Sequence, residues 1–267
     1  MNILICGDIV GRSGRESVER FLPDIVRKDK IDFIIINGEN SASGFGITSK
    51  ICQKLYDLGV DVITSGNHIW DQKEILSYID SDSRLLRPCN FPDNTPGKGF
   101  GVYSLKGGQI ISVINVMCRL FMDNLEDPFK TLDNIIDNLK VKYGSIPIII
   151  DVHGESTSEK MSLGHYFDGK VSAILGTHTH VPTADLQILE KGTFYQTDLG
   201  MCGDYNSVIG MNKENSLKRF FKEVSKKHFP AEGIASLSGV IVDCDEKTGL
   251  AKNIESFIYG GDLQNTH

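Results

Sequence analysis

Short apolar, β-branched runs recur along the chain, and each one ends in a polar segment. Runs of about four to seven such residues are typical of strands buried on both faces. Helical patterns separate many of them, so the order of elements predicts an α/β protein with a largely parallel core sheet. The predicted strands are Ile3–Cys6, Phe33–Ile36, Val60–Thr64, Ile110–Val116, Ile146–Val152 and Val171–Leu175.

The clearest helical pattern is the segment DPFKTLDNIIDNLK, at residues 127–140. Asp127 is a suitable capping residue, Pro128 fits the first helical position, and apolar residues at helical spacing form one stripe. A second helix is predicted over Thr48–Leu58. A first helix is predicted around Val18–Ile25, and we expect Pro23 to kink or shorten it.

Three stretches break the alternation and predict β-hairpins. They are Gly101–Val116, Asp185–Asp198 and Ser238–Phe257, each with a glycine-containing turn. Two sheets with helices outside would accommodate this mixture. No linker, repeat or low-complexity tract divides the chain, so we expect residues 1–267 to form a single domain.

Composition narrows the classes of partner. The 267 residues include 28 Lys and Arg against 35 Asp and Glu, a net charge of -7. Binding to long nucleic acid needs a basic face, so this acidic balance argues against it. The start lacks a signal-peptide pattern and no apolar run is long enough to cross a bilayer. With six scattered cysteines and no C-x-x-C pair, we expect a reduced cytoplasmic protein without a membrane partner.

Candidate chemistry follows the predicted strands. Open α/β sheets place ligand sites at the carboxyl ends of their strands, and five of the runs end in oxygen or nitrogen donors. A mixed set without cysteine suits borderline-hard metals such as Mn, Fe, Co or Zn. Seven donors exceed the needs of one tetrahedral zinc, so we expect a pair of metal ions. The donors are Asp8, Glu39, Asn40, Asn67, His153, His178 and His180.

The ordered set GD…GEN…GNH…VHGE…GTHTHVPT resembles the calcineurin-like metallophosphoesterases. Within that superfamily, the segments GDIVGRSGR, NGENSASGFGIT and GNHIWD are similar to the YmdB-like branch, bacterial enzymes that open 2′,3′-cyclic nucleotides. The resemblance covers nearly the whole chain. It implies a four-layer αββα sandwich, a double sheet that carries a dinuclear metal centre.

One departure from the superfamily pattern affects the ligand set. Most members have Asp-x-His in the first motif, whereas Ile9 and Val10 follow Asp8 here. The resemblance implies that Glu39 bridges the metals and that Asn40 takes the vacated place, an exchange that favours a harder metal. The first metal would then bind Asp8, Glu39, Asn40 and His180. The second would bind Glu39, Asn67, His153 and His178, and iron or manganese is expected.

The resemblance also implies a mechanism. A hydroxide bridging the two metals would attack phosphorus, and His68 would protonate the leaving oxygen as general acid. Asp71 and Glu155 are candidates to orient His68 or a ligand. The expected substrate is a small nucleotide, first of all 2′,3′-cAMP. A phosphomonoesterase or 5′-nucleotidase on the same centre, and a metal- and nucleotide-binding regulatory protein, are the alternatives. Related proteins suggest a homo-oligomer.

Two segments near this site allow two interpretations each. Gly11–Arg15 could hold a phosphate through backbone N–H and guanidinium groups, or be a helix start with solvated arginines. Ser41–Gly46 could be a mobile loop whose Phe45 stacks on a base, or an ordinary glycine-rich connector.

Overall fold

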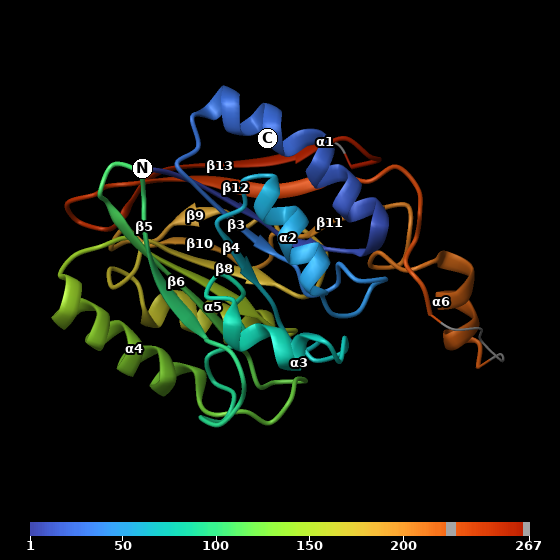
Figure 1. The fold of residues 1–267 in the computed structure, drawn as a ribbon, viewed down its shortest axis with the longest axis horizontal. Coiled ribbons are helices and arrows are strands. Elements are labelled where there is room, and N and C mark those ends of the chain that lie inside the picture. The colour runs from blue at the N-terminus through green and yellow to red at the C-terminus, as the bar shows by residue number, and fades with distance from the viewer. Residues whose placement is uncertain (223–227, 264–267) are drawn as a thin grey trace.

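Two sheets that mix parallel and antiparallel strands form the centre of the computed structural model (Figure 1), which describes residues 1–222 and 228–263. The first sheet has the strand order β13-β12-β1-β3-β4. Its bounds are β1 Asn2–Cys6, β3 Phe33–Asn37, β4 Val62–Thr64, β12 Leu237–Cys244 and β13 Ala251–Tyr259.

The second sheet has the order β5-β6-β7-β8-β10-β9, and a small third sheet pairs β11 with β2. The bounds are β2 Asp8–Ile9, β5 Phe100–Ser104, β6 Ile110–Met117, β7 Ile148–His153, β8 Ala173–Thr177, β9 Gln187–Ile188, β10 Phe194–Gln196 and β11 Met201–Cys202. The predicted strands therefore occur, with bounds shifted by about one or two residues.

Parallel pairing joins neighbouring strands in each of the two larger sheets. β1, β3 and β4 run parallel, and so do β6, β7 and β8. The three predicted hairpins are confirmed as the antiparallel pairs β5–β6, β9–β10 and β12–β13. The parallel strands of each sheet thus end at the same edge of that sheet.

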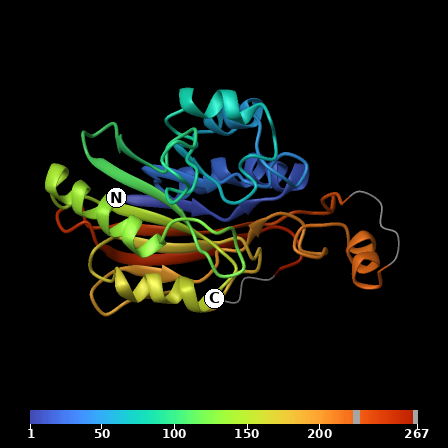
Figure 2. The same cartoon turned by 90° about the horizontal axis from the view of Figure 1, so that it is seen from below.

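Helices α1, α2, α4 and α5 lie over the outer faces of the two sheets, whereas α6 lies to one side of them (Figures 1 and 2). Apolar residues of α1 and α2 pack with one face of the first sheet, and those of α4 and α5 with the second sheet. The bounds are α1 Gly11–Asp29, α2 Ser49–Asp57, α3 Ile75–Tyr78, the 3₁₀ turn Ile79–Ser81, α4 Pro128–Tyr143, α5 Thr157–Tyr166 and α6 Lys213–Phe220.

Alternation along β1 explains why its sequence is apolar throughout. Ile3 and Ile5 join the apolar cluster that both sheets share, whereas Leu4 and Cys6 join the cluster beneath α1 and α2. Successive side chains in a strand point to opposite faces, so a strand that is covered on both sides has no polar face.

Two helices test the predictions made from local sequence. Asp127 caps α4 by accepting hydrogen bonds from the N–H groups of Phe129 (2.9 Å) and Lys130 (3.3 Å), as expected. Of the two expected effects of Pro23, a kink or a shortening of the first helix, the shortening is wrong, because α1 continues to Asp29. Pro23 is exposed, so water can bind the carbonyl that the missing N–H leaves free.

Among the helices of the described residues, none is both long and apolar enough to cross a membrane.

Candidate metal centre

The seven predicted ligands come together where the parallel strands end. Asp8 begins β2, directly beyond β1, and Glu39 and Asn40 follow β3. His153 is the last residue of β7, and the loop after β8 carries His178 and His180, while Asn67 follows β4. Because parallel strands end at the same edge, residues up to 170 positions apart in sequence become neighbours, as Asp8 and His178 do.

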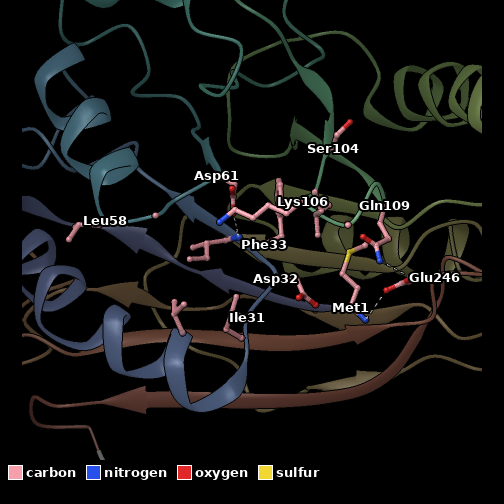
Figure 3. Close-up of a pocket in the computed structure, with 15 residues that line it drawn as sticks. Met1, Ile31, Asp32, Phe33, Leu58, Asp61, Ser104, Lys106, Gln109 and Glu246 are labelled. Atoms are coloured by element: carbon pink, nitrogen blue, oxygen red, sulfur yellow. Dashed lines mark hydrogen bonds and ion pairs between the residues drawn. The ribbon is translucent and has the colours of Figure 1, made fainter.

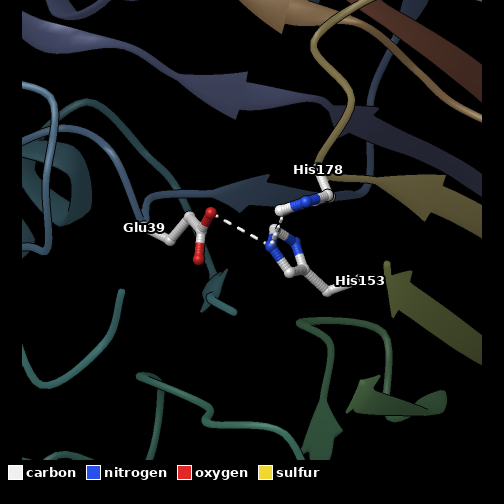
Figure 4. A group of neighbouring side chains, drawn as sticks. All are labelled: Glu39, His153 and His178. Atoms are coloured by element: carbon white, nitrogen blue, oxygen red, sulfur yellow. Dashed lines mark hydrogen bonds and ion pairs between the residues drawn. The ribbon is translucent and has the colours of Figure 1, made fainter. Parts of the chain in front are cut away.

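His153 Nε2 is the atom on which this cluster converges. It lies 3.0 Å from Glu39 Oε1, 3.1 Å from Asn67 Oδ1 and 3.0 Å from His178 Nδ1. Figure 4 shows the Glu39 carboxylate and the His178 ring directed at this nitrogen. Glu39, His153 and His178 form a group whose ligand atoms all lie within 4.8 Å of one another, close enough to share one metal ion.

The outer nitrogens of His153 and His180 form hydrogen bonds to acceptor oxygens, and that of His178 forms an ion-pair contact with a carboxylate. His178 Nε2 lies 3.3 Å from Glu155 Oε2, and His180 Nδ1 donates to the backbone carbonyl of Ile209 (2.8 Å). His153 Nδ1 lies 2.9 Å from Thr177 Oγ1. The Thr177 hydroxyl donates its own proton to Asp151 Oδ1 (2.7 Å), so it accepts from His153.

In the neutral imidazole, one ring nitrogen carries the hydrogen and the other a lone pair. With the outer nitrogens protonated, the lone pairs of His153 Nε2, His178 Nδ1 and His180 Nε2 are the inner ones. Metal-binding histidines in proteins are held in the same way, by an acceptor at the second nitrogen. These three residues therefore fit a cation chemically.

Two further observations support that fit. Asp8 is fully buried, its Oδ2 accepts from the N–H of His178 (3.0 Å), and its Oδ1 has no hydrogen-bond partner among the described residues. Such an orphaned buried oxygen is costly unless a cation binds it. Asn40 Nδ2 lies 3.1 Å from both Glu39 Oε1 and His180 Nε2. Rotating this amide by 180° would offer oxygen instead, since the two orientations are nearly equivalent in shape.

Gly66 leaves the space that the cluster needs. A Cβ at this position would lie 2.2 Å from His153 Cδ2 and 2.4 Å from Glu39 Oε2. Any side chain here would displace two of the predicted ligands. The glycine before Asn67 is thus required by the close approach of other side chains to its backbone.

The electrostatics of the cluster favour positive charge. Burial opposes a charge on His153, but the carboxylates of Glu39 and Asp8 outweigh it and raise its pKa to about 9. Burial also acts against the Glu39 carboxylate, yet His153 and His68 lower its pKa to about 2. Burial raises the pKa of Asp8 to about 6, and burial together with His153 lowers the pKa of His178 to about 3. The field that holds a proton at His153 also attracts a metal cation.

His68 lies at the partly exposed side of the cluster. Its Nδ1 is 2.8 Å from Asp71 Oδ2, so the predicted orienting contact from Asp71 is present. Its backbone N–H donates to Glu39 Oε2 (3.2 Å). The Phe45 ring packs edge-on against the imidazole, with 5.1 Å between ring centroids. These contacts fix His68 beside the carboxylate at the centre of the cluster.

Comparison with known proteins places this chain in a family. The family model described as "YmdB-like protein" matches residues 4–257. A protein of Bacillus subtilis (strain 168) is 47% identical over 98% of both chains. The chain belongs to the YmdB-like family.

The relatives in this family carry names related to phosphoesters. The Bacillus subtilis protein is named a 2′,3′-cyclic-nucleotide 2′-phosphodiesterase. A Mycoplasma pneumoniae protein, 36% identical over 93% of this chain and 89% of its own, is named a putative phosphatase/phosphodiesterase.

Solved structures agree on the fold. A hypothetical protein from Thermus thermophilus has a TM-score of 0.90 at 40% identity, covering 98% of this chain and 100% of that one. A structure described as a novel phosphatase from Mycoplasma pneumoniae has a TM-score of 0.89 at 34% identity, covering 98% and 94%.

The segments with two interpretations are ordered by contacts to the rest of this YmdB-like fold. In Gly11–Arg15, Arg15 donates to the carbonyl of Ser41, and Arg12 lies 3.4 Å from Glu232, so both guanidinium groups have protein partners. In Ser41–Gly46, the carbonyl of Phe45 accepts from Gln72 Nε2 (2.7 Å). This tether and the His68 contact favour a fixed connector over a mobile loop.

Sequence reasoning missed the polar residues behind the ligands. Asn37, Thr64 and Thr177 all bond the buried Asp151 carboxylate, which lies beneath the cluster. A polar residue inside an otherwise apolar strand end, such as Asn37, was the available signal. Lys160 and Asp198 were missed as well.

A cavity of about 690 Å³ lies at the opposite edge of the sheets, near the amino ends of β1, β3 and β4 (Figure 3). None of the described residues that line it is a predicted ligand.

Proposed function

We propose that this protein is a metal-dependent phosphodiesterase that hydrolyses small cyclic nucleotides, 2′,3′-cAMP first among them. The observation that carries the proposal is the orientation of His153, His178 and His180, whose inner lone pairs lie beside the buried carboxylates of Asp8 and Glu39. The name of the 47% identical relative from Bacillus subtilis supports the substrate class.

The proposed centre contains two divalent ions, iron or manganese. Asp8, Glu39, Asn40 and His180 would hold one of them. The other would be held by Glu39, Asn67, His153 and His178. When bound, the pair would supply Lewis acidity, which activates water near neutral pH and offsets charge on the phosphoryl oxygens. Three apolar clusters, one between the sheets and one under each group of helices, support the αββα layering proposed for this scaffold.

His68 is the proposed general acid. Asp71 accepts from its Nδ1 (2.8 Å), which fixes the ring and stabilises the imidazolium. The imidazolium then delivers the Nε2 proton to the leaving ribose oxygen as the P–O bond breaks. Phe45 packs edge-on against His68 and further fixes its ring.

The names of the Mycoplasma relatives favour a second candidate, a phosphomonoesterase on the same centre. Both activities need the same ligands and acid. The remaining parts of the proposal are a single domain, a homo-oligomer, and a cytoplasmic location, the last supported by six free cysteines.

The test uses protein reconstituted separately with Mn²⁺, Fe²⁺ and Mg²⁺ and supplied with 2′,3′-cAMP, 3′,5′-cAMP or AMP, with products separated by chromatography. We expect metal-dependent opening of 2′,3′-cAMP, lost in Asn67→Ala. Phosphate release from AMP alone would replace the phosphodiesterase with the phosphomonoesterase. No turnover despite bound metal would overturn both and favour a nucleotide-binding regulator.

A further inference from the structure

A buried ion pair lies directly behind the histidine loop. Lys160 of α5 is 1% exposed, and its Nζ lies 2.9 Å from Oδ2 of Asp198, which is 0% exposed. The same ammonium donates to the backbone carbonyl of Thr177 (2.7 Å). A lysine is rarely fully buried unless its charge is paired. Asp198 and the carbonyl of Thr177 are the partners that allow the burial of Lys160.

The pair binds the backbone on both sides of His178. Lys160 Nζ holds the carbonyl of Thr177, and Asp198 Oδ2 accepts from the N–H of Thr179 (3.0 Å). The residue between these two anchors offers its Nδ1 to the cluster, 3.0 Å from His153 Nε2. One ion pair therefore fixes the peptide groups that flank a predicted metal ligand.

The held loop has an unusual backbone. His178 has a φ of 100° and His180 a φ of 65°, in the region that favours glycine. Non-glycine residues in such conformations cost free energy and persist only where surrounding contacts hold them. Lys160 and Asp198 supply contacts of this kind at the first of the two positions.

The other oxygen of Asp198 reaches a third part of the site. Oδ1 accepts from the N–H of Gly200 (2.9 Å), and the carbonyl of Gly200 accepts from the N–H of Asp8 (3.2 Å). The carboxylate therefore links the His178 loop to the segment that carries Asp8. Lys160 adds α5, the helix that follows the His153 strand.

Stability alone is a poor explanation for this pair. Replacing a buried ion pair with apolar residues is often neutral or stabilising, because the charges must be desolvated. What apolar residues cannot do is bind the carbonyl of Thr177 and the N–H of Thr179. The contacts thus indicate a role in geometry.

We propose that Lys160 and Asp198 are positioning residues that clamp the loop of Thr177–His180 in the conformation required for cation binding. This inference rests on the proposed metal-dependent function. It assigns the two residues no contact with metal or substrate. Their effect passes through the backbone on either side of His178.

The test measures Mn²⁺ affinity of purified protein without substrate, by electron paramagnetic resonance of the free ion, together with thermal unfolding of the metal-free protein. The variants are Lys160→Met, Asp198→Asn and the double variant with both changes. Lys170→Met is the matched control, because Lys170 forms a more exposed pair with Asp133 (3.1 Å) near the same helix.

We expect each single variant to lose about 10- to 100-fold in Mn²⁺ affinity and to unfold at lower temperature, since each leaves a buried charge unpaired. The double variant has no such charge, so its unfolding temperature should recover while its affinity stays low. The control should change affinity less than about twofold.

The outcomes separate the two claims. If the unmodified protein binds no Mn²⁺, the metal-dependent function fails. If it binds Mn²⁺ and a folded variant binds as tightly, or if affinity recovers with stability in the double variant, the clamp is overturned. Should a single variant not fold, the double variant decides the matter, and Asp198→Asn, the least disruptive change, provides a second measurement.

Discussion

The carboxylates at the two edges of the sheets differ in whether their oxygens have hydrogen-bond partners. In the cavity near the amino ends, Asp32 accepts from the N–H of Asn2 and Asp61 from the N–H of Ile34, both at 2.8 Å. At the carboxyl ends, Asp8 Oδ1 has no hydrogen-bond partner in the described part of the chain. The two acids of the cavity thus bond the backbone near the amino ends of β1 and β3, whereas an oxygen of the cluster has no such bond.

This contrast shows that volume is a weaker guide to function than unsatisfied chemistry. The cavity offers about 690 Å³, yet two of its acids already bond the backbone. The cluster contains a fully buried carboxylate oxygen, Asp8 Oδ1, that no donor among the described residues satisfies, which is expensive for a fold to maintain. Mutations at the two edges should therefore have very different consequences.

The largest expected effect is at the convergence point. His153→Ala should lower hydrolysis of 2′,3′-cAMP by about 10³-fold or more, because Lewis-acid stabilisation is worth several kcal/mol. Gln109→Ala, in the cavity wall, is the control and should change activity less than about twofold. Steady-state kinetics and metal content of both variants check this. A comparable loss in Gln109→Ala would make the cavity part of the active site.

Two glycines, one at each edge, sharpen the comparison. Gly66→Ala places a methyl group against His153 and Glu39, so we expect metal affinity and activity to fall by about 100-fold. Gly59 lines the cavity with a φ of 97°, and a methyl group there would have no neighbouring atom within 4 Å. Gly59→Ala should cost about 1 kcal/mol of stability through backbone strain, with activity unchanged. Calorimetry and metal titration distinguish the cases; tight metal binding in Gly66→Ala would contradict the packing argument.

The proton donor should show a dependence on the leaving group. His68→Gln should reduce turnover of 2′,3′-cAMP by about 100-fold, since the ribose alkoxide that leaves from this substrate needs a proton. A nitrophenyl phosphodiester should suffer far less, because nitrophenolate leaves unprotonated. Asp71→Asn should cost about tenfold by releasing the ring. Equal losses for both substrates in His68→Gln would remove His68 from the role of acid.

Metal affinity should rise with pH. The pKa of His153 is raised to about 9. At pH 7 its imidazole in the metal-free protein therefore carries a second proton, which a metal must displace. Apparent affinity should therefore increase by about tenfold per pH unit between pH 6 and pH 8. Below pH 6, protonation of Asp8, with a pKa of about 6, should steepen the dependence. Titrations across this range check the slope, and a flat profile would refute the competition.

The sequence predicted the cluster because strand ends obey a simple geometric rule. Glu39, His153 and His178 each follow or end an apolar run, and parallel strands bring such positions to one edge. The resemblance to a family then implied the role of His68 as general acid and the division of the ligands between two metals. Local rules also identified α4 and the hairpins, where capping and turn residues act within a few positions.

Long-range contacts could not be predicted in this way. Lys160 lies in a helix, where a lysine normally points to solvent, and Asp198 lies 38 residues later beyond a hairpin. Nothing in either neighbourhood encodes that they meet. Pro23 teaches the converse, because packing of Leu22 and Ile25 on the sheet outweighs the local helix-breaking tendency.

The smallest expected effect concerns the cysteines, none of which is a predicted ligand or one of the described residues that line the cavity. All six are free, and burial raises the pKa of Cys118 and of Cys244 to about 12. A thiolate is the reactive form, so iodoacetamide at pH 8 should label the native protein very slowly and leave activity intact. After unfolding in guanidinium chloride, all six should react, as counted by mass spectrometry. Rapid native labelling with loss of activity would place a thiol in the functional site and break the division between the two edges.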